Sequence, residues 1–225
     1  LKMMLRAEVP RQRAAQDADV TIIVLGGSSA RDFKTDYKNT GAAVVKDNEA
    51  HVSDMESGEG YDRSTLTMLG LQYRLLQAVV ATGKPVVLVT IQGRPLNLNW
   101  ASKNVPAIIN AWYPGEQGGN AVADVLFGDY NPAGRLPVSY PRSVGQLPVY
   151  YNYQRPEKHR YVEEAATPLY PFGYGLSYSK FSYTNLSVSK TKNITITVSF
   201  SLTNTSAVAG DEVPQLYIRQ KYGST

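Results

Sequence analysis

Carboxylate side chains are concentrated in one short part of the chain, residues 53–71, which we call the acidic stretch. Its acids, and the arginine that follows them, are Asp54, Glu56, Glu59, Asp62 and Arg63. Glycines at positions 58 and 60 flank Glu59, so the backbone on both sides of this acid is free to adopt positive φ angles and carry the carboxylate outward. Closely spaced acids interleaved with glycines are not a pattern that a helix or a strand requires. The pattern predicts a loop that presents an acid to a substrate.

The chemistry available to such a loop is acid/base catalysis. Two carboxyl groups that flank a substrate, one protonated and one ionised, can hydrolyse a glycosidic bond. The protonated group needs a raised pKa, which burial or a neighbouring anion provides, and Asp54, Glu56 and Asp62 are such neighbours of Glu59. The same composition fits a solvated loop in which Asp62 and Arg63 form a surface pair or cap a helix. Composition alone favours this plainer interpretation, because charge-rich loops are common.

Composition argues against several other classes of protein. The chain has 23 basic and 19 acidic residues, and because the basic residues form no block, a nucleic-acid partner is not expected. Cysteine is absent, which excludes disulfides and thiolate metal ligands. His51 and His159 lie far apart, so no metal site is expected. The Gly26-Gly27 pair after the first strand lacks the spaced three-glycine fingerprint of a dinucleotide site, and no cofactor is expected. No apolar run approaches the ~18 residues of a membrane span, so no membrane partner is expected either.

The segments that must position the acidic stretch alternate between strands and helices. Apolar runs rich in β-branched residues predict strands, and helical spacing predicts helices. The predicted order is strand 20–25, helix 69–80, strand 85–91, a short helix containing Trp100, strand 107–111 and helix 120–127. The first strand is nearly all apolar, which predicts burial on both faces. Alternation of this kind predicts βαβ units and a parallel sheet, which binds ligands at the carboxyl ends of its strands. The acidic stretch follows the first strand.

Beyond Pro132 the pattern changes twice. Residues 132–178 are rich in proline and tyrosine and lack periodicity, which predicts an extension that wraps the domain. Alternation of period two at 193–200 and 213–218 then predicts strands of an antiparallel sandwich, too few to close a sandwich of ~7 strands. The expected fold is therefore an α/β domain at residues 1–177, with a mostly parallel sheet flanked by helices, followed at 178–225 by part of an antiparallel β-sandwich.

Short motifs occur in a fixed order along nearly the whole chain. They are Glu59-Gly-Tyr-Asp62-Arg63-Ser-Thr-Leu66, Gly93-Arg94-Pro95-Leu96, Ala111-Trp112-Tyr113-Pro114-Gly115, Asn131-Pro132-Ala133-Gly134-Arg135-Leu136-Pro137, Tyr170-Pro171-Phe172-Gly173-Tyr174-Gly175 and Ala209-Gly210-Asp211-Glu212-Val213. In this order they resemble the second domain of glycoside hydrolase family 3 and the start of the fibronectin type III-like domain that follows it. Each motif is short, and their shared order makes the resemblance specific.

The resemblance implies the roles of three residues. Members of the family are retaining β-glycosidases that use an aspartate nucleophile and a glutamate acid/base. Glu59 matches the acid/base, four positions before Arg63. Glu56 is the second candidate for that role and is otherwise a substrate-binding residue. Arg63 either braces the loop through Asp62 or binds the substrate directly.

The resemblance also implies a partner domain. The family's nucleophile lies on an N-terminal (β/α)8-like barrel that has no counterpart in this chain, and the α/β domain is expected to be incomplete at its N-terminus. We therefore expect part of a β-glucosidase, or as a close second a β-xylosidase, that acts on an oligosaccharide or β-glycoside, is inactive without the barrel, and is periplasmic or secreted. The alternative is a non-catalytic carbohydrate-binding or structural module.

Overall fold

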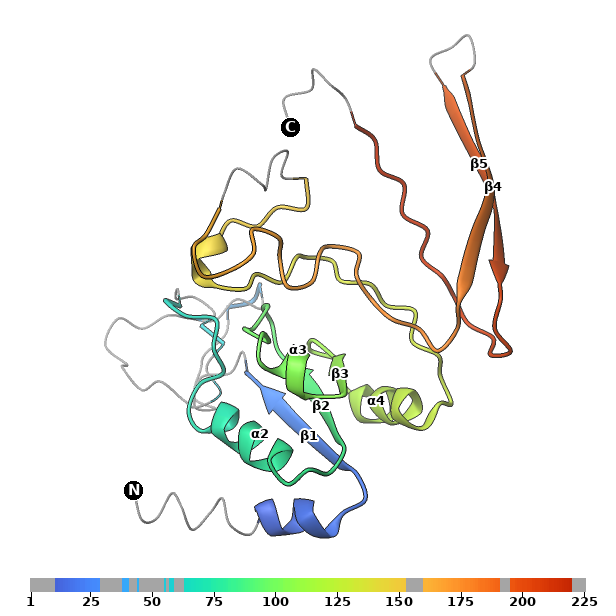
Figure 1. The fold of residues 1–225 in the computed structure, drawn as a ribbon. Coiled ribbons are helices and arrows are strands. Elements are labelled where there is room, and N and C mark those ends of the chain that lie inside the picture. Colours follow the sequence, from blue (N-terminus) through green and yellow to red (C-terminus); the bar gives the residue numbers. More distant parts are fainter. Residues whose placement is uncertain are drawn as a thin grey trace. The chain divides into compact units, whose positions relative to one another are not determined.

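The computed structural model describes residues 11–28, 38–40, 44, 55, 57–58, 63–152, 160–190 and 195–219. It divides the chain into two compact units (Figure 1). The first unit comprises residues 1–118 and 138–171, and the second comprises residues 119–137 and 172–225. Each unit is described by itself.

Among the described residues, the first unit is built on a three-stranded parallel sheet. Its strands are β1 (Thr21–Gly26), β2 (Val86–Ile91) and β3 (Ala107–Asn110), in the order β1-β2-β3. In the register, Thr21 lies opposite Val86 and Val87 lies opposite Ala107. The central strand is the most buried, and Leu88 has no exposed surface. The predicted parallel sheet is confirmed, and the carboxyl ends of its strands share one edge.

Helix α2 (Gln72–Val80) precedes β2 and packs along β1 (Figure 1). Leu76 and Val79 recur on one face of the helix and enter the core, with exposed fractions of 0% and 3%. The helix ends before Gly83, whose φ of +75° suits a residue without a side chain. The predicted helix is confirmed, although it begins at Gln72. No helix in the described part of the chain is long and apolar enough to cross a membrane.

The prediction that β1 is buried on both faces is wrong. Ile23 and Leu25 are each 8% exposed and belong to the core, whereas Ile22 and Val24, on the other face, are 45% and 55% exposed. Strand β1 lies at the edge of the described sheet, and α2 is the helix that packs on it. An apolar run shows which surfaces a strand is suited to bury, but burial itself depends on a second layer over each face.

The tyrosine-rich segment 138–171 completes the first unit. As predicted, it has little regular structure apart from the 3-10 turn η1 (Val144–Gln146). Its backbone is held instead by side chains: the amides of Asn97 and Asn99 both donate to the carbonyl of Arg142, at 3.1 and 2.6 Å. These bonds fix the segment against the chain that leaves β2.

The second unit contains most of α4 (Gly118–Phe127) and an antiparallel pair, β4 (Phe181–Lys190) and β5 (Ile196–Asn204). Asn131 organises its turns: its amide donates to Ser179 Oγ at 2.7 Å and to the Ala209 carbonyl at 2.9 Å. Arg135 also forms an ion pair with Glu212, in which Arg135 Nη2 donates to both carboxylate oxygens at 3.1 Å. The antiparallel sheet agrees with the predicted fold class, whereas the predicted boundary at residues 177 and 178 stays a prediction.

The predicted strand at 213–218 is absent, since this described segment has no regular secondary structure. Leu216 and Ile218 are 68% and 85% exposed. Alternation of period two defines two faces for an extended chain, but a strand also needs a neighbour that accepts its backbone hydrogen bonds. In the described part of the second unit, β4 and β5 pair with each other and leave this segment outside the sheet.

Candidate active site

The carboxylates predicted to carry the chemistry, Asp54, Glu56, Glu59 and Asp62, lie outside the described residues. Their neighbours in the chain are described: Met55, Ser57, Gly58, and the acidic stretch from Arg63 onward. The site is therefore built from the groups that hold this stretch on both sides of Glu59. No group of three His, Asp or Glu side chains able to hold a metal ion occurs within the described ranges.

The first part of the acidic stretch is tied to the end of β1. The Ser28 N–H donates to the Met55 carbonyl at 2.6 Å, and the Ser57 N–H donates to the Ser28 carbonyl at 3.2 Å. Gly27 continues the sheet by donating to the Ile91 carbonyl at 2.8 Å. Met55 and Ser57 therefore lie beyond the carboxyl end of β1, at the edge where parallel sheets bind their ligands.

The second part of the acidic stretch is held by Arg63, Leu66 and Gln72. The Arg63 guanidinium donates to the Thr67 carbonyl. The Leu66 carbonyl accepts a bond of 2.6 Å from the Asn97 N–H. The Gln72 side chain pairs with both backbone groups of Gly26, at 2.7 and 2.9 Å, in the manner of a neighbouring strand. Arg63 thus braces its own segment, and a contact with substrate stays a prediction.

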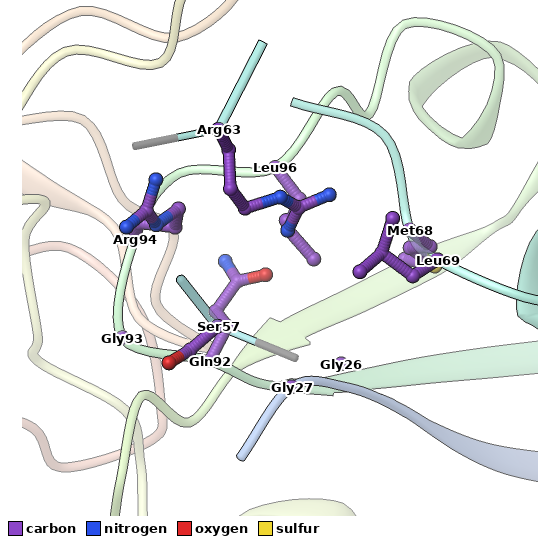
Figure 2. Close-up of a pocket in the computed structure, with 10 residues that line it drawn as sticks. All are labelled: Gly26, Gly27, Ser57, Arg63, Met68, Leu69, Gln92, Gly93, Arg94 and Leu96. Atoms are coloured by element: carbon purple, nitrogen blue, oxygen red, sulfur yellow. The ribbon is translucent and has the colours of Figure 1, made fainter. Parts of the chain in front are cut away.

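A small pocket lies between these tethers and the chain that leaves β2. Its lining consists of Gly26, Gly27, Ser57, Arg63, Met68, Leu69, Gln92, Gly93, Arg94 and Leu96 (Figure 2). Its volume of about 10 Å³ admits about one water molecule. A sugar ring is far larger, so these ten residues do not by themselves form a sugar-binding site. Their arrangement serves to fix the backbone of the acidic stretch.

Gln92 forms the polar floor of the pocket. It directly follows β2 and is only 1% exposed. Its amide nitrogen donates to Tyr140 Oη at 2.5 Å and to Asn110 Oδ1 at 3.2 Å, whereas its Oε1 is buried without a partner in the described structure. In Figure 2 the amide points toward the middle of the pocket. An unpartnered buried oxygen of this kind suits a water or another donor held in the pocket.

Burial controls the chemistry of Tyr140, which is 1% exposed. It raises the pKa of the Tyr140 hydroxyl well above its ordinary value, and the hydrogen bond from Gln92 offsets only part of this effect. The folded state therefore favours the neutral Tyr140 hydroxyl. Because the folded-state pKa of Tyr140 lies above its unfolded-state pKa, the contribution of the neutral hydroxyl to the free energy of unfolding is fully present below the unfolded-state pKa of about 10. It is lost as the pH rises from there toward the folded-state pKa.

We expect Tyr140→Phe to lower the free energy of unfolding at neutral pH by about 1–3 kcal/mol, because the buried Gln92 amide loses an acceptor. Above pH of about 10, the difference from the unmodified protein should shrink, since phenylalanine has no proton to lose. Thermal unfolding of the complete protein across this range measures both effects. Tyr150→Phe is the control, because Tyr150 is 61% exposed. A difference that stays constant with pH contradicts the prediction.

Gly58, which immediately precedes Glu59, is enclosed by two arginines. Its φ is +81°. A β-carbon at this position would lie 2.7 Å from Arg63 Cγ and 3.2 Å from Arg94 Nη2. No other residue type combines this backbone angle with so little space. The chain therefore enters Glu59 from a glycine held between the stem of Arg63 and the guanidinium of Arg94.

Sequence reasoning identified Arg63 but did not single out Gln72, Gln92, Arg94 or Tyr140 as site residues. Arg94 lies in a motif that was noticed only for its resemblance. The available signal for Gln92 was its position, since a polar residue directly after a buried strand lies at the carboxyl edge of the sheet. Nothing in the sequence pairs it with Tyr140.

Comparison with known proteins identifies the family. The model of the glycosyl hydrolase family 3 C-terminal domain matches residues 7–178. A β-xylosidase of Formosa agariphila is 46% identical over 197 residues, which is 83% of this chain and 26% of that protein. A periplasmic β-glucosidase of Salmonella typhimurium is 40% identical over 221 residues, which is 92% of this chain and 26% of that protein.

Solved structures of similar proteins support the same family assignment. A β-glucosidase from Erythrobacter marinus superimposes with a TM-score of 0.74 at 40% identity, covering 92% of this chain and 25% of that chain. A β-glucosidase from Listeria innocua, in complex with gluconolactone, gives a TM-score of 0.71 at 31% identity, and the match covers 90% of this chain and 27% of the Listeria chain. This chain thus spans about a quarter of the length of these relatives. It belongs to glycosyl hydrolase family 3, and residues 7–178 match the C-terminal domain of that family.

Proposed function

We propose that this chain is part of a retaining β-glycosidase that removes terminal, non-reducing β-linked sugars, and that Glu59 is its general acid/base. The observation that carries the proposal is the tethering of the acidic stretch on both sides of Glu59, at the carboxyl edge of the parallel sheet. A solvated surface loop needs no such tethers. Membership of the family and relatives named β-glucosidase and β-xylosidase support the same reaction.

In this mechanism Glu59 acts twice. It first protonates the glycosidic oxygen as an aspartate attacks the sugar, and then deprotonates the water that releases the sugar from the enzyme. Glu56 is the second candidate for the acid/base and is otherwise a substrate contact. Arg63 braces the acidic stretch, and a direct contact with substrate is its other proposed role.

The attacking aspartate is proposed to come from another domain of the same protein, an N-terminal (β/α)8-type barrel. Support comes from the relatives, of which this chain spans about a quarter. The pocket at the described residues, at about 10 Å³, is also too small for a sugar. The chain by itself is accordingly expected to hydrolyse nothing. Within it, residues 1–177 are proposed as the α/β domain and residues 178–225 as part of a fibronectin type III-like domain.

The proposed substrate is a β-glucoside, and a β-xyloside is the second candidate. The relatives of known structure from Erythrobacter marinus and Listeria innocua are named β-glucosidases, whereas the relative that is 46% identical is named a β-xylosidase. Location outside the cytoplasm, in the periplasm or secreted, is proposed from the relative named a periplasmic β-glucosidase.

A panel of 4-nitrophenyl glycosides tests this function on the complete protein. We expect hydrolysis of the β-glucoside or the β-xyloside, no hydrolysis of the α-glucoside, and a first-formed product with the β configuration, as seen by NMR. A first product with the α configuration excludes the double-displacement mechanism. Binding of sugars without turnover of any glycoside instead identifies a non-catalytic carbohydrate-binding module.

A further inference from the structure

Arg94 is the least explained charge in the described part of the site. It follows β2 by three positions, is half-buried, and lines the pocket beside Arg63 and Ser57 of the acidic stretch (Figure 2). With the other described residues its guanidinium forms no hydrogen bond or ion pair. A partly buried cation that lacks a partner is unfavourable, because burial removes solvation without a compensating interaction. Arg94 therefore calls for an anion at this place.

The backbone that carries Arg94 is firmly held. Gln92 is anchored below it through Tyr140 and Asn110. The ring of Tyr113 lies against Gly93, where a β-carbon would approach Tyr113 Cε2 to 2.7 Å. On the other side, the Asn97 N–H bonds to the Leu66 carbonyl of the acidic stretch. A side chain on a backbone fixed at both ends is suited to holding something else in place.

The Arg94 guanidinium lies beside Gly58. The site of the missing β-carbon lies 3.2 Å from Arg94 Nη2, and the stem of Arg63 fills the same space. A peptide bond joins Gly58 to Glu59, so the direction in which the backbone leaves Gly58 decides where Glu59 begins. Glu56 and Glu59 lie within two positions of Gly58 in the sequence, so a positive charge beside Gly58 is electrostatically favourable for this stretch.

We propose that Arg94 is a positioning residue for the acid/base: it holds the backbone at Gly58 and neutralises the acidic stretch, and so fixes the approach of Glu59 to the leaving group. The inference rests on the proposed role of Glu59. It assigns to Arg94 an action through Gly58 and Glu59 and no contact with the sugar. Small displacements of a catalytic group are costly, because about 1 Å of misplacement can reduce a rate by about 10²-fold.

The test uses Arg94→Gln in the complete enzyme, with kcat/KM measured on a phenyl glycoside and on the 2,4-dinitrophenyl glycoside of the same sugar. Phenol is a poor leaving group and needs a proton from the acid, whereas dinitrophenol departs without one. We expect kcat/KM to fall by about 10²-fold for the phenyl glycoside. For the dinitrophenyl glycoside it should change by less than about threefold, because no proton transfer is required.

Two further variants make the result specific. Arg94→Lys keeps the charge and should recover part of the activity on the phenyl glycoside. Lys84→Gln removes one exposed positive charge from the opposite end of β2 and should change neither rate. Equal losses on both substrates, or no loss on either, overturn the proposal. If Arg94→Gln does not fold, Arg94→Lys carries the test, and its loss must again be greater on the phenyl glycoside.

Failure of this inference is distinguishable from failure of the proposed function. Glu59→Gln measured on the same two substrates reports on the acid itself. If Glu59→Gln shows the dependence on leaving group and Arg94→Gln does not, Glu59 is the acid and Arg94 does not position it. If Glu59→Gln lacks that dependence, the assignment of Glu59 is wrong.

Discussion

Glu59→Gln in the complete enzyme is expected to reduce kcat/KM on phenyl or disaccharide substrates by about 10²–10⁴-fold, the usual contribution of a general acid. Glutamine has nearly the same shape and its amide cannot donate a proton to the leaving oxygen. On a 2,4-dinitrophenyl glycoside the loss of kcat/KM should be within about tenfold, because this leaving group departs unprotonated. Steady-state kinetics on the two substrates measure the difference.

Azide provides a second measurement on the same variant. With Glu59→Gln, the sugar remains attached to the nucleophile, because no base activates the incoming water. Azide is already an anion and attacks without a base, so it should raise kcat on the dinitrophenyl glycoside and yield a β-glycosyl azide. The unmodified enzyme should gain nothing from azide.

Glu116→Gln and Glu56→Gln are the matched controls. Glu116 is an exposed acid in the loop between β3 and α4, outside the acidic stretch, and its replacement should leave both rates unchanged. Glu56→Gln should weaken substrate binding without azide rescue. Rescue of Glu56→Gln together with unimpaired Glu59→Gln would transfer the acid/base role to Glu56.

The second large effect is expected from Gly58→Ala. The added methyl group meets Arg63 Cγ at 2.7 Å, and its backbone is held at a φ of +81°. The backbone angle alone costs about 1–3 kcal/mol for a residue other than glycine. The clash is then relieved by movement of Arg63 or of the acidic stretch, and we expect kcat on the phenyl glycoside to fall by about 10²-fold through misplacement of Glu59.

Gly83→Ala separates the cost of the backbone angle from the effect of the steric clash. Gly83 has a φ of +75°, and a β-carbon there would meet nothing within 4 Å. It therefore has the backbone cost without the clash, and it lies after α2, away from the acidic stretch. Thermal unfolding should show a similar backbone cost in both variants, with catalysis impaired only in Gly58→Ala. Equal activity in the two would mean that the contact at Gly58 does not matter for the reaction.

Much of the fold could be predicted because local patterns determine it. Strand β2 was predicted correctly because it is a short apolar run rich in β-branched residues, and helix α2 because its apolar residues recur at helical spacing. The exposed face of β1 and the missing strand at 213–218 could not be predicted in the same way. In both cases the pattern describes a surface, whereas the outcome depends on whether another layer or strand meets it.

In the site too, local sequence patterns could be predicted, whereas contacts between residues far apart in the chain could not. The unusual composition of the acidic stretch drew attention to its four acids and Arg63, but the roles predicted for Glu59, Glu56 and Arg63 came from the resemblance to the family. Glu59 and Glu56 lie outside the described residues. The position of Gln92 at the carboxyl edge of the sheet could be predicted from the sequence, but its burial could not. Its burial depends on Tyr140, which is 48 positions away, in a segment without periodicity.

The pairing of Ser28 with Met55 and Ser57 has a consequence for engineering. These hydrogen bonds join the two ends of the chain between residues 28 and 55, so a longer chain there can begin and end at the same place. Lengthening a loop closed in this way is cheap, at about 0.6 kcal/mol for each doubling. Insertions between Ser28 and residue 53, before the acidic stretch begins, should therefore be tolerated and offer a place to graft new substrate contacts.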